Sequence, residues 1–129
     1  MLAVDTNVVV RYLARDDVEQ TDRATKLIRS EQVWLSKTVL LETAWVLGAT
    51  YGFAHERLAP TLRDLLGLPT VSVEDDLAVA QALDWYEQGL DLPDALHLAS
   101  AGFTMRFATF DRILLRKAKR LPTPEIVSP

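Results

Sequence analysis

Apolar and polar positions follow two different periods in the opening stretch of the chain. Leu2 to Val4 form a short apolar run that leads into Asp5, and apolar residues then recur with helical spacing at Val9, Tyr12 and Leu13. An apolar run followed at once by a spacing of three and four residues predicts a short buried strand and then a helix. Asp5 would therefore end a central strand.

The same alternation continues along the chain. Further strands are expected at 33–35, 70–73 and 106–109, with a fifth at 125–127, and helices at 18–29, 38–51, 54–66, 74–88, 92–105 and 111–119. Short strands that alternate with helices are typical of an α/β fold, in which helices cover both faces of a parallel sheet. The length of 129 residues suits a single domain over 1–129. Prolines near the end suggest a loose tail at about 121–129.

Composition excludes several classes of protein. Hydrophobic residues make up 49% and charged residues 25%, a balance typical of globular rather than disordered chains. No apolar run approaches the ~18 residues that span a bilayer, and no secretory signal pattern is visible, because Asp5 interrupts the first apolar stretch. The chain has no cysteine, so disulfides, thiolate zinc sites and cysteine nucleophiles are absent. We expect a cytoplasmic protein.

The charge is unevenly distributed. The net charge is −4, from 14 Lys and Arg against 18 Asp and Glu, which argues against a nucleic-acid binder that relies on a basic surface. Residues 74–94, however, hold seven acids and no base, whereas residues 112–120 hold five bases and no acid. Arg112, Arg116 and Lys117 in the basic segment are candidate phosphate contacts, although a solvated helix face explains them equally well.

Four acids stand out by their positions. Asp5 ends the first expected strand, Glu42 lies inside the most apolar helix, Asp94 lies in the first turn of the helix that follows Asp91, and Asp111 follows the fourth strand. Because parallel strands end at the same edge of a sheet, where open α/β folds bind ligands, Asp5 and Asp111 should share that edge.

Helix capping is the structural alternative for most of these acids. Asp5 and Asp111 each precede a helix, and Asp is a favoured N-cap residue. Asp91 with Asp94 could form a reciprocal capping pair. For each of them taken alone, capping is the more common role.

Glu42 has no capping role, because it lies too far inside its helix. Its helical neighbours are largely apolar: Thr38, Val39, Trp45 and Val46. We therefore expect its carboxylate to share a face with the core, where an unpaired charge costs several kcal/mol. Arg11 or Lys37 could compensate this charge, and a metal ion is the alternative.

A metal ion would also explain the acids as a set. Carboxylates that converge without a cation raise one another's pKa values. Mg²⁺ and Mn²⁺ prefer such hard oxygen ligands, and these ions can generate a nucleophilic water and stabilise a phosphodiester transition state. Without the four acids the chain would hold 14 bases and 14 acids, so its net acidity need not repel a nucleic acid.

At this point four motifs together resemble the PIN domain. They are Asp5-Thr6-Asn7 after the first strand, the helix sequence Leu41-Glu42-Thr43-Ala44-Trp45-Val46-Leu47, the sequence Asp94-Ala95-Leu96-His97-Leu98-Ala99, and Thr109-Phe110-Asp111 after a late strand. Chain length and the Leu41–Trp45 wording resemble the VapC toxins of bacterial and archaeal toxin–antitoxin pairs. The resemblance covers essentially the whole chain. It implies a three-layer α/β/α domain with a parallel sheet of four or five strands, and a Mg²⁺- or Mn²⁺-dependent endoribonuclease, usually a homodimer inhibited by a cognate antitoxin protein.

The resemblance also implies roles for individual residues. The catalytic and metal-binding acids would be Asp5, Glu42, Asp94 and Asp111, and the polar residues beside them Thr6, Asn7 and Thr109, with Asp91 as a secondary candidate. Asp5 would be the central ligand, with Asp94 and Asp111 bound directly or through water, and Glu42 would act through water or as a general base. Asn7 and Thr109 would orient carboxylates.

The sequence also offers other candidate residues and two alternative functions. His97 lies one turn after Asp94, but a single histidine between two leucines is more often structural. Trp34, Trp45 and Trp85 are most simply core or interface residues. A catalytically silent module that binds RNA or protein is the alternative function. A phosphatase with an aspartate nucleophile is disfavoured, because Asn7 occupies the place of its second aspartate and no Gly-rich phosphate loop is present.

Overall fold

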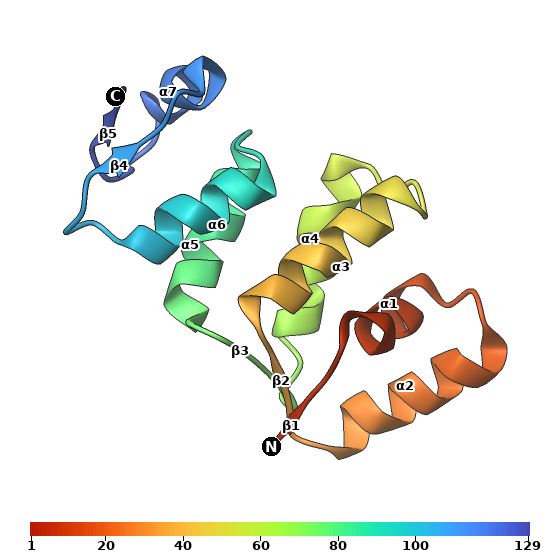
Figure 1. Ribbon diagram of the computed structural model, residues 1–129. Coiled ribbons are helices and arrows are strands. Elements are labelled where there is room, and N and C mark those ends of the chain that lie inside the picture. Colours follow the sequence, from red (N-terminus) through yellow and green to blue (C-terminus); the bar gives the residue numbers. More distant parts are fainter. The chain divides into compact units, whose positions relative to one another are not determined.

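Strands and helices alternate along the whole chain, and all three strand pairings are parallel, which confirms the expected α/β class. The computed structural model describes residues 1–129. The elements are β1 (Leu2–Ala3), α1 (Thr6–Ala14), α2 (Val18–Ser30), β2 (Val33–Leu35), α3 (Lys37–Ala49), α4 (His55–Leu66), β3 (Val71–Val73), α5 (Asp76–Glu87), α6 (Leu92–Ala101), β4 (Phe107–Ala108), α7 (Arg112–Ala118) and β5 (Ile126–Val127). They are labelled in Figure 1.

The chain divides into two compact units, Met1–Glu74 and Asp75–Pro129, and each is described by itself. The five strands are correspondingly divided between two sheets. The first unit holds a three-stranded sheet in the order β1-β2-β3, and the second holds the pair β4-β5.

The sheet of the first unit is centred on β2. Its residues Val33 and Leu35 are each 1% exposed, and they pair with Val71 and Val73 of β3. The strand β1 lies at the edge, and both of its residues are exposed. The expectation of a buried, central first strand was therefore wrong. A two-residue strand with a single neighbour leaves its side chains in solvent, and the apolar residues that reach the core come after it.

Helices cover this sheet and complete a core. Buried residues from two strands and three helices form one cluster: Val9, Ile28, Val33, Leu35, Leu65 and Val71. The helix α1 packs against both α2 and α3, and α3 packs against α4 (Figure 1). The Thr70 hydroxyl donates a hydrogen bond of 2.6 Å to the Ile28 carbonyl and so ties the start of β3 to α2.

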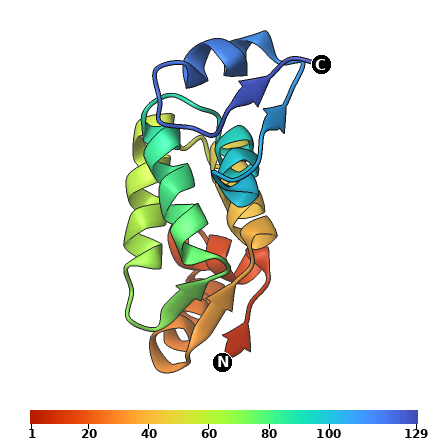
Figure 2. The ribbon, with the colours of Figure 1, turned by 90° about the vertical axis from the view of Figure 1, so that its left-hand side faces the viewer.

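The second unit consists of a helix pair and a short sheet. The helices α5 and α6 pack against each other. The strands β4 and β5 lie side by side (Figure 2), with Phe107 opposite Ile126 and Ala108 opposite Val127. The tail expected to be loose thus contains a hydrogen-bonded strand, and Pro124 just before it is buried.

Two helix ends differ from the expected ones for backbone reasons. The helix expected from Glu74 begins at Asp76, because Asp75 adopts a left-handed conformation with φ of 51°. The helix expected to reach Met105 ends at Ala101, because Gly102 has φ of 78°, a region that glycine enters without strain. No helix has both the length and the apolar character that crossing a bilayer requires.

Candidate functional site

Asp5 stands where the chain turns from β1 into α1. Its backbone is extended, with φ of −83° and ψ of 162°, and its Oδ1 accepts a hydrogen bond of 2.7 Å from the Thr6 N–H. A strong N-cap bonds the second or third N–H of the helix instead. Asp5 therefore occupies the cap position but caps weakly, and its Oδ2 forms no hydrogen bond within the protein.

Asp5 and Glu42 line one cleft of the first unit. The cleft has a volume of about 290 Å³ and is lined by Asp5, Thr6, Asn7, Val10, Arg11, Glu42, Val46, Thr50 and Tyr51. Two of the four predicted acids are thus brought together, along with the polar residues Thr6 and Asn7. Thr6 is 7% exposed, whereas Asn7 is exposed on the rim.

The expectation that Glu42 is buried was wrong. The buried face of α3 consists of Leu40, Thr43, Ala44 and Leu47. Glu42 lies on the opposite face and is exposed, as is Trp45 one turn later, which keeps 68% of its surface in solvent. Both faces of α3 carry apolar residues, so spacing alone did not identify the inner one. Arg11, an expected counter-charge for Glu42, pairs with Asp16 instead.

The acids of the second unit interact through their charges. Asp94 is half-buried in the first turn of α6, and its pKa is raised, first by burial and then by the negative charges of Asp91 and Asp111. The positive charges of His97 and Lys117 act in the opposite direction. These three carboxylates therefore form an electrostatic group in which burial and like charges disfavour the ionised form of Asp94.

Capping explains one of these acids and not the others. Asp111 Oδ1 accepts hydrogen bonds from the N–H groups of Ile113 at 2.9 Å and Leu114 at 3.1 Å, so it is a true N-cap of α7. Asp91 stands at the N-cap of α6 without a side-chain hydrogen bond, so the expected capping pair with Asp94 does not form. The Thr109 hydroxyl accepts a 3.0 Å hydrogen bond from the Asp111 backbone N–H rather than contacting its carboxylate.

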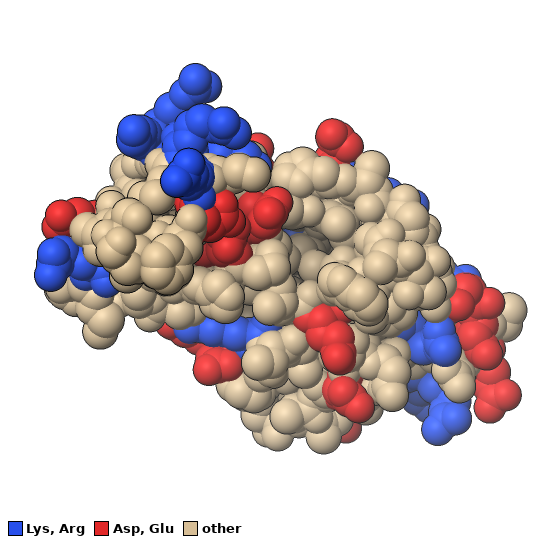
Figure 3. Space-filling view, turned by 45° about the horizontal axis from the view of Figure 1, so that its top comes forward, with Lys and Arg blue, Asp and Glu red and all other residues tan.

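The remaining predicted residues lie at the surface. His97 is exposed, although Leu96 and Leu98 on either side of it are buried. Arg112 and Arg116 are exposed on α7, where Lys and Arg side chains gather (Figure 3). Lys117 is exposed too, but its Nζ donates a 2.9 Å hydrogen bond to the Gly89 carbonyl. Among the tryptophans, Trp85 is fully buried and Trp34 is half-buried.

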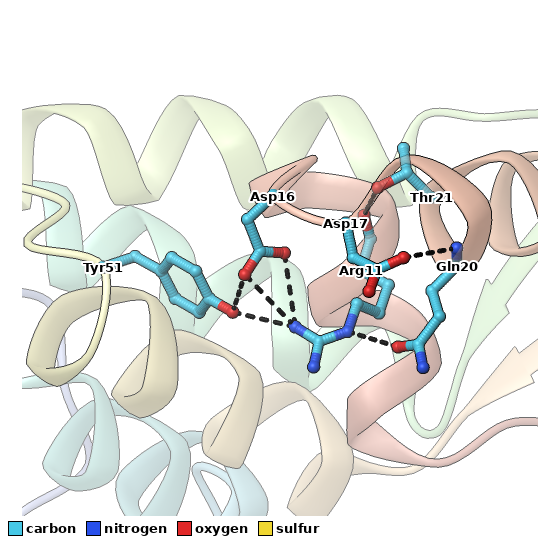
Figure 4. Close-up of polar contacts among 6 residues, drawn as sticks. All are labelled: Arg11, Asp16, Asp17, Gln20, Thr21 and Tyr51. Atoms are coloured by element: carbon cyan, nitrogen blue, oxygen red, sulfur yellow. Dashed lines mark hydrogen bonds and ion pairs between the residues drawn. The ribbon is translucent and has the colours of Figure 1, made fainter.

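A polar cluster beside the cleft was missed by sequence reasoning. Arg11, Asp16, Gln20 and Tyr51 form a network of hydrogen bonds at the meeting point of α1, α2 and the end of α3 (Figure 4). Tyr51 lies 35 residues after Asp16, so no local motif connects them. The one sequence signal was Arg11, a charged residue in the helix that follows Asp5.

The acids present fit a hard divalent cation. Their donors are carboxylate oxygens, the ligands that Mg²⁺ and Mn²⁺ prefer. Glu42 forms no hydrogen bond or ion pair within the protein, and the raised pKa of Asp94 reflects like charges that a cation would offset. In neither unit do three or more acidic or histidine side chains already stand in a metal-binding arrangement.

Comparison with protein-family models identifies a family for this chain. The family model of the PIN domain matches residues 2–120. The matched region runs from β1 through α7, includes all four predicted acids and ends before β5. No curated protein matches the chain.

Proposed function

Because this chain belongs to the PIN domain family, whose members are typically metal-dependent nucleases, we propose that it is a Mg²⁺- or Mn²⁺-dependent endoribonuclease. The observation that carries the proposal is the cleft that Asp5 and Glu42 line together. Both carboxylates are exposed and keep oxygen atoms without a partner in the protein. Neither helix capping nor ion pairing within the protein fully explains why a carboxylate stands at these two positions.

We propose Asp5, Glu42, Asp94 and Asp111 as the metal-binding acids, as the resemblance to the PIN domain implies. Bound there, the ion would lower the pKa of a water molecule and offset the charge that develops on the phosphate. Glu42 would accept a proton from the attacking water as general base. The water oxygen then bonds to phosphorus, one ester P–O bond breaks, and the leaving oxygen takes up a proton. Asn7 would hold the carboxylate of Asp5 in orientation from the rim of the cleft.

We further propose the biological setting that the resemblance to VapC toxins implies. The protein would be the toxin of a toxin–antitoxin pair, would form a homodimer in the cytoplasm and would be inhibited by a cognate antitoxin protein. Supporting features are the order of the four motifs along the chain and the Leu41–Trp45 sequence. Expression in a bacterial host should arrest growth, and Asp5→Asn should remove that arrest.

The enzymatic test is cleavage of labelled RNA with defined metal. We expect cleavage with Mg²⁺ or Mn²⁺, none with chelator, and a loss of at least about 100-fold in kcat for Asp5→Asn or Glu42→Gln. Asp22→Asn is the matched control, because Asp22 is an exposed acid on α2 outside the cleft. Full activity of a folded Asp5→Asn variant would overturn the proposal.

A second measurement separates the enzyme from the silent binding module. Calorimetric titration with Mn²⁺ should give a site that Asp5→Asn and Asp94→Asn each weaken by 10-fold or more, while Asp22→Asn leaves it intact. RNA binding without a Mn²⁺ site and without cleavage would favour the binding module instead.

A further inference from the structure

Arg11 is shared by two cavities of the first unit. One is the cleft with Asp5 and Glu42. The other is a groove of about 550 Å³ between α1 and α2, lined by Asn7, Val8, Arg11, Gln20, Arg23, Ala24 and Leu27. Since Asn7 and Arg11 line both, a chain that leaves the cleft past Arg11 enters the groove, where Arg23 supplies a second positive charge.

The guanidinium of Arg11 is fixed by three side chains. Its Nε donates to Gln20 Oε1 at 2.6 Å, and its Nη1 donates to Tyr51 Oη at 2.9 Å and to Asp16 Oδ1 at 3.2 Å. The Tyr51 hydroxyl in turn donates to Asp16 Oδ2 at 2.8 Å, which closes the network. The third nitrogen, Nη2, carries no hydrogen bond (Figure 4).

Stability alone does not explain this network. The ion pair is open to solvent, with side chains of Arg11 and Asp16 that are 32% and 42% exposed, and such surface pairs contribute little to stability. What the network does achieve is to restrict a long side chain to one orientation. The hydrogen bond from Tyr51 is the largest cause of the lowered pKa of Asp16, so the network favours the charged form of this carboxylate.

A fixed guanidinium with an unused edge suits a phosphate. Its planar N–H groups match phosphate oxygens, and a side chain that is already ordered loses less entropy when it binds. A free carboxylate of a protein partner offers similar acceptors, but the cleft next to Arg11 is where the proposed reaction needs a phosphodiester. The position of Arg11 beside this cleft therefore favours a nucleic acid over a protein partner as its ligand.

We propose that Arg11 binds the RNA backbone, with Nη2 donating to a phosphate next to the one that is cut. The adjoining stretch of the strand then lies in the groove beside Arg23, and Asp16, Gln20 and Tyr51 are positioning residues that act through Arg11. This inference rests on the proposed ribonuclease function and adds a substrate subsite to it.

The first test is the salt dependence of RNA binding. A fluorescein-labelled single-stranded RNA is titrated in an Asp5→Asn background, where it is not cut. Each phosphate contact contributes about 0.7 to the slope of log K against log salt for single strands, so Arg11→Gln should make the slope shallower by about 0.7. Arg29→Gln is the matched control, an exposed arginine of α2 that lines neither cavity. An unchanged slope in Arg11→Gln would overturn the proposal.

The second test separates charge from geometry. Arg11→Lys keeps the positive charge but loses the planar set of N–H donors. The slope of log K against log salt should therefore remain, while KM for RNA rises several-fold. Tyr51→Phe should also raise KM with little change in kcat, because Arg11 stays charged but less well held. If Arg11→Gln fails to fold, Arg11→Lys decides, and an unchanged KM in that variant would count against the subsite.

The two proposals fail in different ways. If the wild-type protein neither cuts nor binds RNA, the ribonuclease function itself is lost. If it cuts RNA and the Arg11 variants match it in KM and salt slope, then only the subsite is wrong. Loss of binding to a protein partner in Arg11→Gln, with RNA kinetics intact, would assign the free guanidinium edge to that partner.

Discussion

The ammonium group of Lys117 donates a hydrogen bond to the carbonyl oxygen of Gly89 across 2.9 Å. This contact ties α7 to the turn before α6, the helix whose first turn holds Asp94. The positive charge of Lys117 lowers the pKa of Asp94, against the larger effects of burial and of Asp91 and Asp111. The structure thus gives Lys117 a role inside the acidic group, in addition to the phosphate contact expected from sequence.

Lys117→Gln should raise the pKa of Asp94 further in the metal-free protein. The substitution removes a positive charge that favours the ionised carboxylate, while Asp91 and Asp111 remain. Carboxyl ¹³C NMR titration of Asp94 measures the change directly. Lys119→Gln, at the end of the same helix, is the control and should leave that titration where it is.

Asp94→Asn should stabilise the metal-free protein at neutral pH. The folded-state pKa of Asp94 is raised above its ordinary value of 3.8, so its contribution to stability is present below that value and is lost as pH rises through the raised pKa. The advantage of the variant should therefore grow across that window and then level off. Denaturation with chelator from pH 3 to pH 7 checks this.

The same pair of proteins tests the metal. Added Mn²⁺ should raise the melting temperature of the wild type more than that of Asp94→Asn, because a ligand stabilises the state that binds it. Equal gains in the two proteins would mean that Asp94 does not contribute to the metal site.

Two substitutions at Asp111 should separate its cap from its charge. Asp111→Ala removes both hydrogen bonds to α7 and should lower the free energy of unfolding by about 1 kcal/mol. Asp111→Asn retains a good cap and should cost much less. Both should lose RNA cleavage, since both lose the carboxylate. Urea denaturation and the cleavage assay together give the result, and an active Asp111→Asn protein would reduce Asp111 to a structural residue.

Two threonines, the buried Thr43 and the half-buried Thr70, should respond in opposite directions to replacement by valine. Thr43 is fully buried and its hydroxyl has no hydrogen-bond partner, so Thr43→Val should raise the free energy of unfolding by about 1 kcal/mol. Thr70→Val loses the bond to the Ile28 carbonyl and should lower it by about 1 kcal/mol, with that acceptor left unpaired. Urea denaturation of both variants measures the difference, and a destabilised Thr43→Val protein would mean that the hydroxyl is satisfied.

The order of elements could be predicted because strands and helices here differ clearly in apolar period. The strand at 33–35 coincides with β2, since a short run of bulky apolar residues ends at Ser36, whose side chain caps the next helix. Helix ends were less accurate where backbone conformation decides them, as at Asp75 and Gly102. Gly102 is a residue type that often ends a helix, so its sequence carried a signal, whereas no side-chain pattern predicts the left-handed φ of Asp75.

The candidate acids could be found from sequence, but their environments could not. Glu42 was singled out for a burial that it does not have, because α3 presents apolar residues on both faces and only packing against α1 and α4 selects the inner one. The network around Arg11 depends on Tyr51, which approaches only when α3 has folded back on α1. Contacts of this range follow from tertiary packing rather than from spacing.

Arg15 ends α1 with φ of 56°, a left-handed conformation that lets the chain reverse within a few residues and enter α2. That tight turn sets how far Asp16 lies from the guanidinium of Arg11. The contacts that hold the Arg11 guanidinium therefore depend on the length of this loop. One residue inserted after Arg15 would remove no functional group from the protein, but it would keep the network from assembling. Lengthening this connection would therefore test the network without changing a single side chain to which the proposed function gives a role in binding RNA or metal.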